Sequence, residues 1–415
     1  MDMAKPKIRF KGFTDDWEQR KLGEIASSFE YGLNAAAKEY DGENKYIRIT
    51  DIDDNTHEFL TYNLTSPDID LTDVENYKLA EGDILFARTG ASVGKSYIYR
   101  DSDGLVYYAG FLIRARIREE YDAEFVFQST LTDKYNKYIA VTSQRSGQPG
   151  VNAQEYSEFE IRVPEKEEQT KIGTYFHNLD HLITLHQRKC EETKKLKKYM
   201  LQKMFPQNGR TVPEIRFAGF TDAWEQRKLG KLVDRVTRKN QDLVSELPLT
   251  ISAQYGLIDQ NEFFDKRVAS KDVSGYYLIE NGEFAYNKST STDAPWGAVK
   301  RLDRYENGVL STLYIVFGIK ENNPVDSDFL VSYYSTNLWH KGIHEIAAEG
   351  ARNHGLLNIA PADFFETELT MPQDIEEQKK IGKYFEELER LITLHQHKCE
   401  QLQNMKKFML QNMFV

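Results

Sequence analysis

The chain has 415 residues, of which 40% are hydrophobic and 29% charged, a balance typical of a soluble protein with two or three globular domains. It contains no run of about 18 apolar residues, and its first residues lack the apolar core of a signal peptide, which excludes a membrane-spanning protein. The two cysteines fit a reducing, cytoplasmic compartment. Because the net charge is −11, local basic clusters or a more basic partner must carry any contact with nucleic acid.

A leader segment opens the chain and recurs in its middle. Residues 8–23 read IRFKGFTDDWEQRKLG, and residues 215–230 differ from them only at Ala218 and Ala223. A long helical segment is also written twice: 25 of the 39 positions in 167–205 are identical in 376–414. The chain is therefore a tandem duplication of leader, variable domain and helix. The variable domains have diverged far more than the rest, which indicates two different targets or, alternatively, drift under weak constraint.

The first domain, residues 1–163 with leader 8–23, is mainly strand-like. Aromatic and β-branched runs bounded by Gly and Asp predict strands, and an apolar stretch predicts one helix over 124–141. The second domain, residues 207–371 with leader 215–230, follows the same plan and has its helix at 329–346. Both domains are predicted to share one mixed α+β fold. The expected strands are 45–50, 83–88, 97–99, 111–116, 249–252, 284–288 and 314–317.

A long helix is predicted after each domain, at 164–206 and at 372–415. In each helix, apolar residues step by four and three over about 40 residues, and neither repeated segment contains proline. At about 1.5 Å per residue the helices would be roughly 60 Å long. A narrow apolar stripe on such a helix favours pairing of the two copies as an antiparallel coiled coil. Separate burial of each helix against its own domain is the alternative.

The short connection after the first helix predicts that the architecture closes on itself. About ten residues separate Phe205 from Ile215, and they reach at most about 36 Å. The second leader must therefore lie near the end of the first helix. If a pseudo-two-fold axis relates the halves, the first leader lies near the end of the second helix. The sequence thus predicts that Ile8 and Phe414 are neighbours in a circular arrangement.

Two motifs suggest ligand chemistry, and neither is complete. Residues 90–96, GASVGKS, resemble a phosphate-binding loop but are one residue short, and a strand-like run follows where a helix is needed. His186 with Cys190, repeated as His395 with Cys399, would form a zinc site only if the helices crossed there. Small and polar residues in a coiled-coil seam are the preferred interpretation. Catalytic, metal and dinucleotide motifs are otherwise missing, so we expect no catalysis and no metal site in this chain.

Four loops at matching places in the two domains combine Arg, Lys, Asn, Gln, Ser and Thr with glycines. Arginine and lysine bind guanine edges, Asn and Gln read adenine, and Ser and Thr hold phosphates. Any single loop of this kind is more often only solvated, but four matched loops favour DNA contact. The candidate DNA-binding residues are Arg88, Thr89, Ser92, Lys95, Gln144, Arg145, Gln148, Asn287, Lys288, Ser289, Thr290, Arg352, Asn353 and His354.

The whole pattern resembles the specificity subunit of a Type I restriction–modification system. The resemblance is carried by the leader WEQRKLG at 17–23, its copy at 224–230, and the EEQ…IG helix starts at 167 and 376. Stretches 82–85, 150–152 and 286–289 also resemble the family's target-recognition domains. The family has two such domains alternating with two helical regions, as the duplication does here.

The resemblance implies a non-catalytic, DNA-binding subunit. Each domain would read one half of a split target in double-stranded DNA, and the helices would set the spacing and dock two modification (methyltransferase) subunits. Restriction subunits would join them for cleavage. S-adenosylmethionine, ATP and Mg²⁺ would then be bound by those partners and not by this chain. A protein-binding scaffold, with two adaptor domains on a coiled coil, is the alternative.

Overall fold

The structure is a computed structural model that describes residues 5–145, 147–252, 255–292, 294–322, 325–347, 352–353 and 355–415, with the backbone alone at 352–353. Its contacts divide the chain into two compact units. Unit 1 comprises Met1–Lys189 and His395–Val415, and unit 2 comprises Cys190–Leu394. Each unit contains one variable domain together with parts of both long helices.

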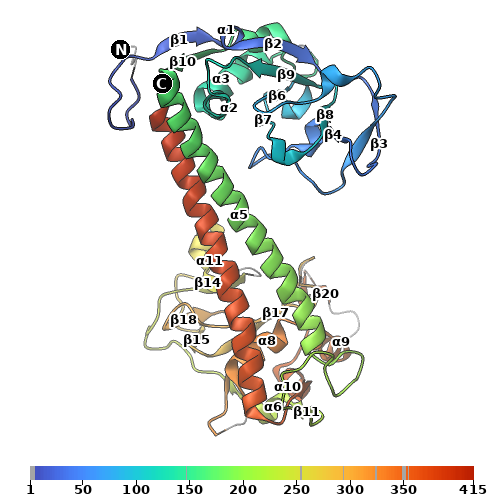
Figure 1. Cartoon of the computed structure of the whole chain (residues 1–415). Coiled ribbons are helices and arrows are strands. Elements are labelled where there is room, and N and C mark those ends of the chain that lie inside the picture. The colour runs from blue at the N-terminus through green and yellow to red at the C-terminus, as the bar shows by residue number, and fades with distance from the viewer. Residues whose placement is uncertain are drawn as a thin grey trace. The chain divides into compact units, whose positions relative to one another are not determined.

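A four-stranded antiparallel sheet, in the order β2-β9-β6-β7, forms the centre of the variable domain in unit 1 (Figure 1). All four residues of β6 are buried, and successive side chains point to opposite faces of the sheet. Ile84 and Phe86 pack toward the helices, and Leu85 and Ala87 toward the smaller sheets. The elements are β1 (Glu18–Lys21), α1 (Leu22–Ile25), β2 (Ala26–Tyr31), β3 (Ala36–Glu39), β4 (Lys45–Ile47), β5 (Thr65–Asp68), β6 (Ile84–Ala87), β7 (Ser96–Ile98), β8 (Val106–Tyr108), β9 (Leu112–Ile117), α2 (Ala123–Ser129), α3 (Asp133–Thr142), α4 (Ala153–Ser157) and β10 (Glu160–Val163), with short 3-10 turns at Ile49–Asp51, Glu75–Tyr77, Gly90–Ser92 and Asp101–Asp103.

Unit 2 repeats this design with the sheet β12-β19-β16-β17. Phe284 and Tyr286 of β16 pack toward the helices, and Ala285 packs on the opposite face. The elements are β11 (Glu225–Lys228), α6 (Leu229–Leu232), β12 (Val233–Val236), β13 (Leu249–Ser252), β14 (Gly256–Asp259), α7 (Gln260–Phe264), β15 (Tyr277–Glu280), β16 (Phe284–Asn287), β17 (Ala298–Arg301), β18 (Asn307–Leu310), β19 (Ile315–Ile319), α8 (Ser327–Tyr334), α9 (His340–Ile346), β20 (Arg352–Asn353), β21 (Leu356–Leu357), α10 (Pro361–Glu366) and β22 (Glu368–Met371). The predicted mixed α+β fold, shared by both domains, is confirmed.

Two predicted helices are in fact broken. The segment 124–141 forms α2 and α3, because Thr130 bonds back to the Phe127 carbonyl and the Thr132 side chain accepts from the backbone N–H of Tyr135 to begin a new helix. The segment 329–346 likewise forms α8 and α9 with a break between them. A smaller correction concerns the strand predicted at 45–50: β4 ends at Ile47, and a 3-10 turn follows.

The long helices α5 (Lys166–Met204) and α11 (Ile375–Met413) have 39 residues each, as the repeat predicts. Within unit 1 they pair antiparallel. Oδ1 of Asp180 lies 2.6 Å from Nζ of Lys406, and further along α5 the backbone oxygen of Ile183 lies 3.7 Å from Sγ of Cys399. The contacts therefore advance along α5 while they move back along α11. Antiparallel pairing is confirmed.

Unit 2 contains equivalent contacts at positions shifted by the repeat. Lys197 pairs with Glu389, and Sγ of Cys190 lies 3.9 Å from the backbone oxygen of Ile392. The start of α5 also packs on the domain of unit 1 through Ile172 and Phe176. The apolar stripe of α5 therefore packs partly against the domain and partly against α11, so the two alternatives are combined. A two-fold axis between the units stays a prediction.

The histidines and cysteines of the alternative zinc site make different kinds of contact. His186 and His395 contact each other through Nδ1 atoms 2.9 Å apart, but the two cysteines face backbone carbonyls. Across the residues that the structure describes, no three His, Cys, Asp or Glu side chains gather to hold a metal ion. In the same residues, no helix combines the length and apolarity needed to span a membrane.

The predicted closure of the chain is confirmed within unit 1. The backbone N–H of Ile8 donates to the carbonyl of Asn412 at 2.9 Å, and the Phe414 ring packs against Trp17, Phe125 and Phe176 at centroid distances of 5.2–6.4 Å. Unit 2 repeats these contacts at the end of α5. There the Ile215 N–H donates to the Lys203 carbonyl at 2.9 Å, and Phe205 packs against Trp224, Phe329 and Phe385.

A circular permutant should therefore fold. Joining the termini through a short flexible linker and reopening the exposed turn at 207–209 preserves every contact just described, since Asn208 and Gly209 have positive φ and lie at the surface. We expect a melting temperature close to that of the parent chain. A control reopened inside α5, between His186 and Gln187, should lose the cooperative transition. Equal damage in both permutants would contradict closure.

Candidate nucleic-acid interface

Two of the predicted contact loops lie side by side in unit 1. The hairpin between β6 and β7 is joined to the segment that follows α3, and we call residues 88–95, 143–145 and 147–151 the first loop pair. The Gly90 N–H donates to the Pro149 carbonyl at 3.0 Å, and the Val151 N–H donates to the Arg88 carbonyl at 3.0 Å. The sequence did not predict this pairing, because about 50 residues separate the two segments.

Unit 2 builds the same backbone bridge from other residues. We call residues 287–290 and 352–357, excluding 354, the second loop pair. The Thr290 N–H donates to the Gly355 carbonyl at 2.7 Å, and the Leu357 N–H donates to the Lys288 carbonyl at 2.9 Å. Lys288 thus occupies the place of Arg88, and Thr290 the place of Gly90. The two loop pairs have one backbone pattern and different side chains.

Buried aromatic residues support both loop pairs from beneath. In unit 1, Phe86 stacks on Tyr156 at 4.7 Å, and the Tyr156 hydroxyl donates to the Ala87 carbonyl and accepts from the Gly94 N–H. Burial raises the pKa of Tyr156, so its hydroxyl keeps its proton. In unit 2, Tyr286 stacks on Phe364 at 4.8 Å, and its hydroxyl donates to the Trp296 carbonyl. The loops are therefore held on a rigid base.

The side chains of the hairpin in unit 1 differ in their freedom to contact a ligand. Lys95 is mostly buried, and its ammonium group contacts the Ile52 carbonyl and the Asp54 carboxylate. Arg88 is half-buried, and its guanidinium lies over two aromatic rings. Thr89 bridges to Gly150, and Ser92 ends the 3-10 turn. Because Gly94 has a φ of +87° and a strand follows, the loop is a hairpin turn without the helix that a phosphate-binding loop requires.

Most of the second segment of the first loop pair is exposed, namely Gln144, Arg145 and residues 147–149, whereas Ser143 and Val151 are buried. Arg145 donates to the carbonyls of Thr142 and Gln144 and pairs with Glu155. Gln144 donates to the Ala140 carbonyl at 3.3 Å. Gln148 approaches Gly90 so closely that a Cβ there would lie 3.0 Å from its Nε2 atom. Arg145 and Gln144 would have to exchange internal bonds to contact DNA.

In the second loop pair, Asn287 uses its Oδ1 atom to accept from the Ser289 N–H at 2.9 Å, and Thr290 donates its hydroxyl to the Gly355 carbonyl. Ser289 is exposed and bridges to Leu356. Arg352 and Asn353 form β20, and their side chains lie outside the description. His354 lies outside the described residues. All fourteen candidates remain predictions as DNA contacts.

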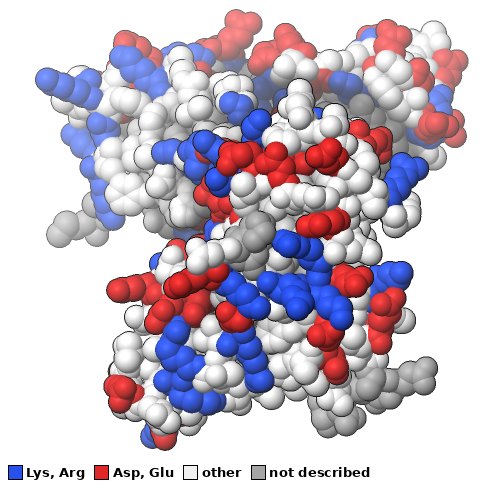
Figure 2. Space-filling model, turned by 90° about the horizontal axis from the view of Figure 1, so that it is seen from below, with Lys and Arg blue, Asp and Glu red and all other residues white. Residues whose placement is uncertain are grey.

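Sequence reasoning missed two aromatic residues that join this surface. Tyr31 and Phe111 are both exposed and lie over the guanidinium of Arg88. The sequence signal is limited to a neighbouring glycine, since Tyr31 precedes Gly32 and Phe111 follows Gly110 at the start of the strand predicted at 111–116. On the face shown in Figure 2, Lys and Arg side chains gather in several groups with Asp and Glu between them. The charge pattern alone therefore does not outline an interface.

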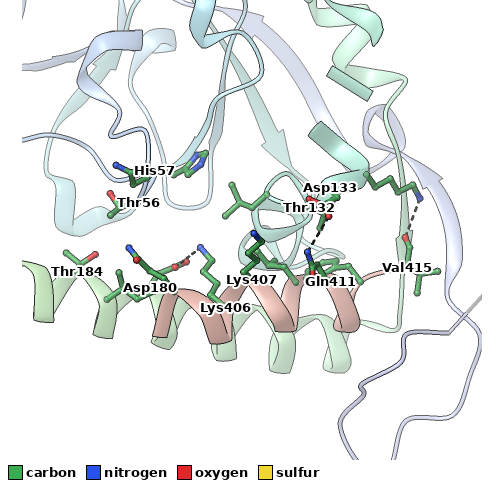
Figure 3. A pocket seen from close by; sticks show the side chains of 17 residues that line it. Thr56, His57, Thr132, Asp133, Asp180, Thr184, Lys406, Lys407, Gln411 and Val415 are labelled. Atoms are coloured by element: carbon green, nitrogen blue, oxygen red, sulfur yellow. Dashed lines mark hydrogen bonds and ion pairs between the residues drawn. The ribbon is translucent and has the colours of Figure 1, made fainter. Parts of the chain in front are cut away.

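A cavity of about 650 Å³, lined by both polar and apolar side chains, lies between the domain and the long helices of unit 1. Figure 3 shows the paired Asp180 and Lys406 on one side and Thr56 and His57 on the other. His57 contacts the Ser96 carbonyl through Nδ1 at 2.8 Å, and burial lowers its pKa. Within this cavity the carboxylate of Asp180 and the ammonium group of Lys406 neutralise each other.

Comparison with known proteins agrees with the architecture. A family model described as Type I restriction modification DNA specificity domain matches residues 14–195. A protein of Methanocaldococcus jannaschii, named as the specificity subunit of the Type I restriction enzyme MjaX, is 25% identical over 414 residues, which cover 95% of this chain and 91% of that protein.

A solved structure shares the fold. It is the S subunit of a Type I restriction–modification system from M. genitalium, which matches with a TM-score of 0.67 at 12% identity and covers 99% of both chains. At that identity the likeness concerns the fold alone. Residues 14–195 match the Type I restriction modification DNA specificity domain, and the duplicated leaders and helices with their two α+β domains make the whole chain similar to the specificity subunits of Type I restriction–modification systems.

Proposed function

We propose that each loop pair reads one half of a bipartite target in double-stranded DNA. The observation that carries this proposal is the repeated backbone bridge with different side chains. Arg88, Thr89 and Ser92 stand on the bridge in unit 1, whereas Lys288, Ser289 and Thr290 stand on the bridge in unit 2. Phosphate contacts position a protein on DNA, while side chains at base edges specify the sequence. One scaffold with two sets of side chains therefore suits two half-sites of different sequence.

The long helices are proposed to dock two modification subunits and to set the distance between the half-sites. At 39 residues each and about 1.5 Å per residue, α5 and α11 are about 58 Å long, which exceeds one turn of DNA at about 34 Å. Exposed apolar side chains recur at equivalent positions of the two helices. They are Leu196 and Tyr199 on α5, and Met405 and Phe408 on α11.

In the proposed complex this chain performs no chemistry. The modification subunits would bind S-adenosylmethionine and methylate adenine, and the restriction subunits would use ATP and Mg²⁺. The negative net charge of this chain is then compatible with DNA binding, because the partners share the contact with phosphates. A scaffold that binds only proteins is the competing hypothesis, and the exposed apolar residues alone would fit it.

The test is to express the chain with a methyltransferase subunit encoded next to it and to map adenine methylation across the host genome. We expect a two-part motif with a fixed spacer that appears only when both proteins are present. The methyltransferase expressed alone is the control. A stable complex that produces no sequence-dependent methylation and selects no sequence from a random DNA library would favour the protein scaffold.

A further inference from the structure

Arg88 is held in place through both its backbone and its side chain. Its backbone N–H donates to the Phe111 carbonyl at 3.1 Å, and its carbonyl accepts from Val151. Its guanidinium carbon lies 5.2 Å from the centre of the Tyr31 ring and 5.7 Å from that of Phe111. The Tyr31 hydroxyl accepts from the Ala153 N–H at 3.3 Å, which fixes this ring as well. Both the backbone of Arg88 and its guanidinium group are therefore fixed in orientation.

The guanidinium has no acceptor within the described part of the chain. Nε of Arg88 is buried without a hydrogen-bond partner, and neither Nη atom forms a hydrogen bond or ion pair there. Arginine carries five N–H donors in a fixed planar fork. A buried donor without a partner is costly, so an external acceptor would stabilise this arrangement. The other arginines nearby behave differently, since carboxylates pair with Arg48, Arg100, Arg114, Arg116 and Arg145.

The two rings also remain open to a ligand. Tyr31 is 45% exposed and Phe111 is 60% exposed, although aromatic side chains of this size are usually covered. An arginine stacked on aromatic faces keeps its N–H edge directed away from the rings. The rings therefore restrict the plane of the fork. A fork held in one plane can engage two acceptors of one ligand at once, and the O6 and N7 atoms of guanine form such a pair.

We infer that Arg88, clamped by Tyr31 and Phe111, reads one guanine of the half-site recognised by unit 1, through the O6 and N7 acceptors of that base. This inference rests on the proposed function and names a specificity-determining residue for it. Arginine bound to O6 and N7 of guanine is the commonest specific contact in the major groove. The contact would satisfy the guanidinium donors that have no partner in the described part of the chain.

Unit 2 lacks this clamp at the matched position. Lys288 replaces Arg88. Phe86 pairs with Ile113 in the first sheet, and Tyr286 pairs with Ile315 in the second. By this register, Leu313 takes the place of Phe111. No aromatic ring lies over the Lys288 ammonium group among the described residues of unit 2. The two half-sites are therefore read differently at this position.

The test compares Arg88→Lys, Arg88→Ala and Phe111→Ala by mapping adenine methylation in cells that also express the methyltransferase. Arg88→Lys keeps the charge and removes the fork. We expect it to reduce the preference for guanine at one position by about 10- to 100-fold, with the other half-site unchanged. Phe111→Ala should weaken the same position to a smaller extent. Arg48→Lys, whose fork is bound by Asp51, is the matched control and should leave the motif unchanged.

Other outcomes separate the inference from the proposed function. If Arg88→Lys methylates the unaltered motif at the parent rate, or slows all sites equally as a phosphate contact would, the guanine assignment is wrong. If the parent chain directs no bipartite methylation, the proposed function itself fails. A melting temperature equal to that of the parent shows that Arg88→Ala folds, so a loss of methylation without relaxed specificity would also count against the inference.

Discussion

Replacing Arg9 with alanine should destabilise unit 1 by about 3–5 kcal/mol, the usual cost of removing one partner from a buried ion pair. Nε and Nη2 of Arg9 each lie 2.7 Å from a carboxylate oxygen of Glu168, whose side chain is 0% exposed. Without the guanidinium, the carboxylate would remain buried and unpaired. Chemical denaturation of the full chain at neutral pH, followed by hydrogen exchange in unit 1, measures the loss.

The duplicated half provides a matched comparison. Arg216 binds Glu377 in the same bidentate way at 2.6 and 2.7 Å, but Nε1 of Trp224 also lies 3.4 Å from that carboxylate. Among the residues that the structure describes, the equivalent indole N–H of Trp17 has no hydrogen-bond partner. We therefore expect Arg216→Ala to cost less than Arg9→Ala. Lys5→Ala, which removes an exposed pair with Asp16, should cost under about 1 kcal/mol, and a similar value for Arg9→Ala would refute the argument.

The repeat made the large features predictable. A heptad-like stripe in two copies predicts two long helices that pair, and the short link between Phe205 and Ile215 predicts that the first leader lies at the end of α11. The hydrogen bond from Ile8 to Asn412 confirms that inference. This inference depended on the duplication, because a contact that the short link requires in one half is expected at the equivalent residues of the other half.

The details of the interface were less predictable because they depend on tertiary contacts. Lys95 is a plausible phosphate ligand from sequence, but Asp54 and the Ile52 carbonyl occupy its ammonium group. The rings that hold Arg88 come from Tyr31 and Phe111, which are distant in sequence and carry no motif. The break between α2 and α3 was missed because no Gly or Pro marks it. The side chain of Thr130 ends α2, and the side chain of Thr132 caps the start of α3.

Changing both Tyr199 and Phe408 to aspartate should abolish binding of the modification subunits. These aromatic residues occupy equivalent positions on α5 and α11 and are 50% and 55% exposed. Leu196 and Met405 lie three residues before them, on the same helix face in each case. Exposed aromatic anchors of this kind contribute about 2 kcal/mol or more each to an interface, and a buried aspartate would add a desolvation cost.

The single variants give the sharper result. If each helix docks one modification subunit, Tyr199→Asp or Phe408→Asp alone should reduce the complex from two such subunits per chain to one, measured as the mass of the purified assembly. Lys198→Asp is the control, because Lys198 is exposed and lies about 100° around the helix from Tyr199, yet the change in charge is larger. Two subunits bound to the double variant would show that docking uses another surface. One subunit lost with Lys198→Asp would show that charge, and not the apolar face, controls assembly.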